Sequence, residues 1–217
     1  MRIRVTMLLL SVALLASGCK GRMFPASQGN LTPDPPASAS SQDAAQAGLK
    51  VMQSLVMTEN FQGLGFSSVD QVKNAQLGDP LKVFRVPLDA LSAYKGDANA
   101  FGLLQDAHKM IYPLTVDQQV VSSLSATQRD DGWRANEFGN SALTRALVAH
   151  LAGKDDFVVW VPALKIYFTA RGQGEGLVLT TIMDDPRFDF KAGQNIPASQ
   201  AFTILQKFAS SYNGLPQ

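Results

Sequence analysis

Apolar residues recur at helical spacing in some stretches of the chain and follow β-favouring patterns in others, so the fold mixes helices with strands. The helical stretches are 42–59, 67–76, a short turn at 89–94, 142–151 and 198–212. The strand-like runs are 82–86, 110–114, 119–127, 133–138, 157–161, 163–170 and 177–183. This order predicts an α+β fold, with an antiparallel sheet of about five to six strands and N-terminal, middle and C-terminal helices packed mainly on one face.

Pro162 interrupts the longest extended stretch, which covers 157–170. Proline has no backbone N–H to give to a neighbouring strand, so it is tolerated at a sheet edge, at a bulge or at a break. We therefore expect one of these three features at Pro162.

The first residues form a pattern of their own. Arg2 and Arg4 precede an apolar run over 5–16, which is about a dozen residues long, whereas a membrane-spanning helix needs roughly 20. Small residues follow, and Gly18 stands directly before Cys19, which is the single cysteine of the chain. The pattern predicts a signal peptide over 1–18 that is cleaved between Gly18 and Cys19.

The segment Leu15-Ala16-Ser17-Gly18-Cys19 resembles the lipobox of bacterial lipoproteins. The resemblance covers residues 1–19 alone, and Ala16 stands where these motifs more often have leucine. It implies that the Cys19 thiol carries a diacylglyceryl group and that Cys19 becomes the N-terminus. Two or more acyl chains anchor a protein stably, so the membrane is an expected partner and no membrane-spanning helix is needed. Lys20 at the next position implies outer-membrane sorting in enteric-type cells.

Prolines and small polar residues dominate the stretch that follows Cys19. Residues 20–41 hold four prolines, four serines and three alanines with few large apolar groups, a composition typical of a solvated spacer. We expect a lipidated N-terminus and tether over 19–41 and one globular domain over 42–217, located in the cell envelope and facing the periplasm or the exterior.

The charge balance argues against a nucleic-acid partner. The full chain has 19 basic and 18 acidic residues. Removal of residues 1–18 takes away Arg2 and Arg4, which leaves 17 basic against 18 acidic residues. A near-neutral domain produces no positive field for a phosphate backbone.

Few residues in the chain point to catalysis or to a metal site. A single cysteine and two histidines leave little for a metal centre, and we expect neither a metal nor another cofactor. His108 and His150 are the two side chains with ordinary pKa values near neutrality, but neither stands in a catalytic motif. His150 falls near a helix C-terminus, and His108 precedes a strand. The sequence therefore favours a protein that is not an enzyme.

Aromatic and cationic residues on the predicted strands form the best candidate for a binding surface. These candidates are Trp133, Arg134, Trp160, Tyr167 and Arg171. Tyr167 alternates with the apolar residues Ile166 and Phe168, so its ring faces the other side of the sheet from theirs. Aromatic side chains beside arginine suit contact with a protein, a peptide or a glycan.

These observations lead to a lipid-anchored envelope protein with a non-catalytic binding or scaffolding domain, whose partner is an envelope protein or glycan. Two alternatives stay open. One is an envelope hydrolase with a dispersed active site that uses His108 or His150 as its base. The other is an inhibitor-like or chaperone-like module that offers a sheet edge near Pro162 for strand addition.

Overall fold

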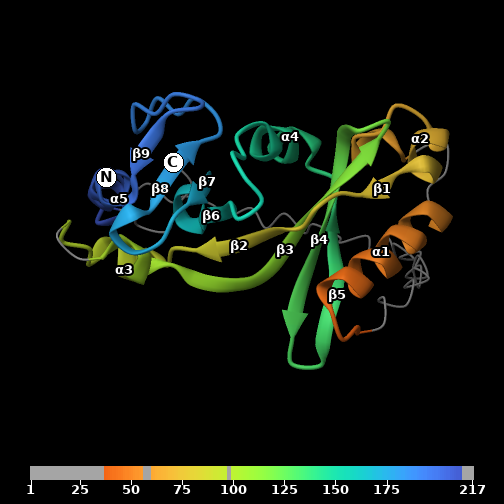
Figure 1. Ribbon diagram of the computed structural model, residues 1–217, viewed down its shortest axis with the longest axis horizontal. Coiled ribbons are helices and arrows are strands. Elements are labelled where there is room, and N and C mark those ends of the chain that lie inside the picture. The colour runs from red at the N-terminus through yellow and green to blue at the C-terminus, as the bar shows by residue number, and fades with distance from the viewer. Residues whose placement is uncertain (1–36, 56–59, 97–98, 212–217) are drawn as a thin grey trace, which may run out of the picture. The chain divides into compact units, whose positions relative to one another are not determined.

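The computed structural model describes residues 37–55, 60–96 and 99–211 (Figure 1). The predicted signal peptide, Cys19 and the predicted tether up to residue 36 lie outside the described residues. The described residues group into one compact unit. No helix in the described part of the chain has the length and apolar character needed to cross a membrane.

One sheet organises this unit. Its strands are β1 (Gln76–Leu77), β2 (Leu81–Arg85), β3 (Gln105–Val116), β4 (Gln119–Arg129), β5 (Gly132–Phe138), β6 (Phe157–Val161), β7 (Ile166–Arg171), β8 (Val178–Thr181) and β9 (Asn195–Pro197). They are ordered β5-β4-β3-β2-β6-β7-β8-β9, and β1 also pairs with β3. Within the described residues, every strand pairing is antiparallel except the parallel contact between β2 and β6. The α+β class with a mostly antiparallel sheet is confirmed.

The sheet is larger than the five to six strands predicted, because nine strands pair within the described residues. The short strands β1 and β9 have too few residues to show an alternating pattern. Pro162 marks a break, since the 3₁₀ turn Pro162–Leu164 divides the long extended stretch into β6 and β7. It marks no edge, because β6 pairs with β2 on one side and β7 on the other.

The helices follow the apolar periodicity seen in the sequence. They are α1 (Ser41–Leu55), α2 (Val69–Asn74), α3 (Leu88–Ser92), α4 (Ser141–Ala149) and α5 (Ala198–Ala209). The start of α1 has a local cause: the Ser40 hydroxyl accepts a hydrogen bond from the Asp43 backbone N–H at 3.1 Å and donates to the Asp43 carboxylate at 2.7 Å. Such reciprocal bonds satisfy donors that a helix N-terminus leaves unpaired.

The middle helix covers the opposite face of the sheet from the N-terminal and C-terminal helices. Ile111 of β3 and Val158 of β6 belong to the apolar cluster that contains Leu147 of α4. Successive strand residues point to opposite faces, and their neighbours Tyr112 and Val159 pack in the clusters of α1 and α5, respectively. The prediction that all three helices lie mainly on one face is therefore wrong for α4.

Two clusters of apolar side chains occupy the face that α1 and α5 cover. Figure 1 shows α1 beside β4 and β5, and α5 beside β8 and β9. Helix α3 packs on α5, and just beyond the end of α3 the ring of Tyr94 meets that of Phe202 edge to face with centroids 6.2 Å apart. Helix α4 lies over β4 on the other face, and that placement creates the pocket described next.

Candidate functional site

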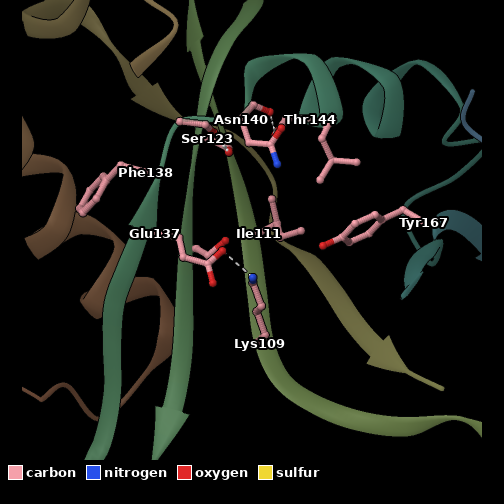
Figure 2. Close-up of a pocket in the computed structure, with 11 residues that line it drawn as sticks. Lys109, Ile111, Ser123, Glu137, Phe138, Asn140, Thr144 and Tyr167 are labelled. Atoms are coloured by element: carbon pink, nitrogen blue, oxygen red, sulfur yellow. Dashed lines mark hydrogen bonds and ion pairs between the residues drawn. The ribbon is translucent and has the colours of Figure 1, made fainter. Parts of the chain in front are cut away.

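A pocket of about 280 Å³ lies between the sheet and the start of α4 (Figure 2). Strands β3 and β4 supply its floor through Lys109, Ile111, Ser123 and Ser125. The end of β5 and the first turn of α4 supply further walls through Glu137, Phe138, Gly139, Asn140, Leu143 and Thr144, and Tyr167 comes from β7. The pocket therefore joins strands from both sides of the parallel contact between β2 and β6.

The connection from β5 into α4 gives the pocket its shape. Gly139 has φ of +102° and Asn140 has φ of +61°, a left-handed conformation that glycine and asparagine adopt more readily than most residues. This tight turn brings α4 back over β4. The Ser123 hydroxyl donates to the Gly139 carbonyl, the Gly139 N–H donates to the Ser123 carbonyl at 3.0 Å, and the Thr144 hydroxyl donates to the Asn140 carbonyl at 3.1 Å.

A cation and an anion meet at the pocket. Lys109 Nζ lies 2.6 Å from Glu137 Oε2 and 5.8 Å from the centroid of the Trp160 ring. The Lys109 side chain is 14% exposed, whereas the Glu137 side chain is 58% exposed. The ammonium is thus enclosed between a carboxylate and an aromatic face, both of which favour its charge. The carboxylate is the charged group that a ligand arriving from solvent meets first.

Tyr167 forms the side of the pocket opposite Glu137, and its ring stacks on that of Trp160 outside the lining. Trp160 and Tyr167 are directly opposed across β6 and β7, and their rings stack with centroids 5.8 Å apart and planes 8° apart. Figure 2 shows the Tyr167 hydroxyl directed into the pocket. Burial, and to a lesser extent the nearby Glu137 carboxylate, raises the pKa of Tyr167 above its ordinary value of 10.0. The phenol is therefore a protonated hydrogen-bond donor at neutral pH.

The structure brings two of the five predicted binding residues together. Trp160 and Tyr167 stack on the α4 face of the sheet, and Tyr167 lines the pocket. Trp133 packs in the α1 cluster instead, and its backbone pairs with Ser38 through two hydrogen bonds of 2.9 Å. Arg134 binds Asp131 at 2.5 Å, and Arg171 lies exposed at the end of β7. The five residues therefore do not form one surface.

Sequence reasoning missed Lys109, Glu137 and Asn140. Lys109 and Ile111 alternate along β3, as Ser123 and Ser125 do along β4, and this alternation is the sequence signal that places them on one face. Alternation along β5 does not predict which face of the sheet Glu137 occupies. A register irregularity in the β4–β5 pairing places Glu137 opposite Ser125 and so on the pocket side.

The two candidate histidines lie outside the pocket lining. His108 is exposed in β3 with φ of +50°, and its backbone N–H donates to the Asp106 carboxylate at 2.8 Å. His150 follows the last turn of α4 as predicted, and its carbonyl accepts from the Thr169 hydroxyl at 2.9 Å. Among the described residues, no hydrogen bond joins either imidazole to a serine, threonine or cysteine side chain. The same part of the chain contains no group of three or more metal-ligating side chains.

The raised pKa of Tyr167 has a measurable consequence. Stability that depends on the protonated phenol is present in full below about pH 10 and is lost as the pH rises through the higher pKa of the folded state. Burial also raises the pKa of Tyr112, so the phenolate absorbance of the protein should contain a late component from both residues, and Tyr167→Phe should remove its own share of it. Glu137→Gln should shift the share of Tyr167 to lower pH, because it removes a neighbouring negative charge. A titration curve that Tyr167→Phe leaves unchanged at high pH would contradict this assignment.

Comparisons with protein-family models, with curated protein sequences and with solved structures gave no match to this chain.

Proposed function

We propose that this chain is a lipoprotein of the cell envelope, anchored through acylated Cys19, whose folded unit binds an envelope partner without catalysis. The observation that carries the binding role is the pocket, where the Lys109–Glu137 ion pair faces Tyr167, whose ring stacks on Trp160. A pocket with a few convergent polar groups is the usual form of a small-molecule site. The resemblance of residues 15–19 to a lipobox supports the anchor, and Lys20 favours the outer membrane.

The chemistry of the pocket favours binding over hydrolysis. A nucleophilic serine needs an adjacent base to remove its proton. The Ser123 hydroxyl instead donates to the Gly139 carbonyl, and Lys109 is held by Glu137. Neither His108 nor His150 lines the pocket, so the hydrolase alternative gains no support from it. Strand addition near Pro162 gains none either, because β6 is paired on both sides.

Replacing Cys19 tests the anchor. Cys19→Ser removes the only thiol of the chain, so the protein should move almost completely from the membrane fraction to the soluble fraction after cell lysis. Mass spectrometry of the N-terminal peptide should find acyl chains on Cys19 in the unaltered protein. Ser17→Ala is the matched control, because it keeps a small residue before the cleavage point and should leave the protein membrane-bound. Equal membrane retention of the Cys19→Ser protein, or an unacylated Cys19 thiol, would contradict the proposal.

A further inference from the structure

We propose that the pocket binds one ring of a neutral sugar, presented by a glycan of the cell envelope. This inference rests on the proposed binding function and specifies the chemical class of the ligand. It follows from three properties of the pocket: its charge, the donors and acceptors that it presents, and its size.

The charge of the pocket favours a neutral ligand. Lys109 and Glu137 are the two charged residues in its lining, and their charges cancel. An anionic ligand would have to pass the exposed Glu137 carboxylate and take the enclosed Lys109 ammonium from its partners. A cationic ligand would compete with Lys109 for Glu137 and meet like-charge repulsion. An anionic ligand would leave Glu137 without its partner, and a cationic ligand would leave Lys109 without its partner. An unpaired charge in a partly buried site lowers the binding free energy that the ligand can gain.

The donors and acceptors of the pocket suit hydroxyl groups. A hydroxyl group donates one hydrogen bond and accepts up to two, so it is best held where donors and acceptors stand close together. The pocket presents the Glu137 carboxylate as an acceptor and the Tyr167 phenol as a donor. The Asn140 amide, which can do both, also points toward the pocket (Figure 2). A ring with hydroxyl groups on neighbouring carbons can use all three groups at once.

The apolar part of the lining suits the carbon face of such a ring. Ile111 of β3 and Leu143 of α4 both line the pocket, so C–H groups of a ligand find apolar neighbours between the polar ones. The volume of about 280 Å³ corresponds to about nine water molecules at roughly 30 Å³ each. This is the scale of one sugar ring. The exposure of Glu137 leaves room for the rest of a glycan to continue into solvent.

The test uses the full chain purified in detergent, with binding measured by saturation-transfer NMR and calorimetry. The neutral probes are the methyl glycosides of glucose, galactose, mannose and N-acetylglucosamine. The charged probes are glucuronate, glucosamine and inorganic phosphate, and the dipeptide Ala-Ala represents a peptide ligand. We expect at least one neutral glycoside to bind with a dissociation constant of about 1–10 mM, as befits a single small ring. Its charged counterparts should bind at least about fivefold more weakly.

Variants of the pocket connect the binding to this site. Tyr167→Phe keeps the stack on Trp160 and removes the donor, so it should weaken binding about fivefold. Glu137→Gln should weaken it roughly tenfold, because it replaces a charged acceptor and leaves Lys109 without its partner. Tyr94→Phe and Glu175→Gln make the same chemical changes away from the pocket and should leave the dissociation constant unchanged. Thermal unfolding of each variant separates lost binding from lost folding.

Three other outcomes would each contradict the sugar site, and they can be told apart. Binding of Ala-Ala or of a charged probe alone, lost in Tyr167→Phe, would keep the pocket as a binding site and reject the sugar. Sugar binding that Tyr167→Phe and Glu137→Gln leave unchanged would place the sugar elsewhere. If no probe binds while every variant is folded, the sugar site is rejected. The anchoring part of the proposed function is tested independently by Cys19→Ser.

Discussion

Phe202→Ala should lower the free energy of unfolding by about 3–5 kcal/mol, which is among the largest effects of a single side chain in this fold. Phe202 is 0% exposed and lies in the middle of α5, in the cluster that joins this helix to β6, β7 and β8. Its ring meets that of Tyr94 edge to face at 6.2 Å. Truncation removes the aromatic contact and leaves a cavity that the surrounding strands can fill only in part.

Phe208→Ala is the matched control for this experiment. Phe208 belongs to the same helix and is 37% exposed, and it touches the Phe188 ring with centroids 4.7 Å apart. Its loss should cost about 1 kcal/mol, because much of the ring is already in contact with water. Chemical unfolding followed by circular dichroism measures both changes. Equal losses in the two variants would mean that α5 does not pack as described.

Gly48→Val should lower the free energy of unfolding by about 1–3 kcal/mol by moving α1 away from the sheet. Gly48 lies in the buried stripe of α1, directly over β4 and β5. A Cβ at this position would overlap the Cβ of Ala135 and lie 3.1 Å from Leu124 Cδ1. Valine favours helix over glycine by a few tenths of a kcal/mol, which is too little to offset this overlap.

Gly63→Val provides the control for Gly48→Val. Gly63 is exposed in the 3₁₀ turn Gln62–Leu64, and a Cβ there would meet no atom within 4 Å. We expect a change within about 0.5 kcal/mol. If Gly48→Val is as stable as Gly63→Val, the close approach of α1 to Ala135 is contradicted.

The sequence predicted the elements of this fold better than their arrangement. Apolar periodicity predicted α1, α4 and α5 to within a few residues, except that the predicted positions 56–59 and 212 lie outside the described residues. Which face of the sheet a helix covers depends on contacts between distant segments. The left-handed turn at Gly139 and Asn140 sends α4 to the face opposite α1, and no local pattern shows its direction.

The candidate site was predicted in part for the same reason. Trp160 and Tyr167 lie on consecutive strands, so the prediction that these strands pair antiparallel already brings the two residues close to each other. Lys109 and Glu137 lie on β3 and β5, with β4 between them, and an irregular register decides that their side chains share a face. The β4–β5 irregularity between Ser125 and Ala126 follows from no residue pattern in the sequence. The Lys109–Glu137 ion pair therefore could not be predicted without the structure.

The single parallel pairing, between β2 and β6, joins an earlier set of strands (β1 to β5) to a later one (β6 to β9). Tyr167 comes from the later set, and every other residue of the pocket lining comes from the earlier set, from α4 or from the turn between β5 and α4. A bound molecule would contact both sets of strands and so stabilise the pairing between β2 and β6. Ligand occupancy should therefore slow amide hydrogen exchange along β2 and β6, although neither strand contributes a residue to the pocket wall.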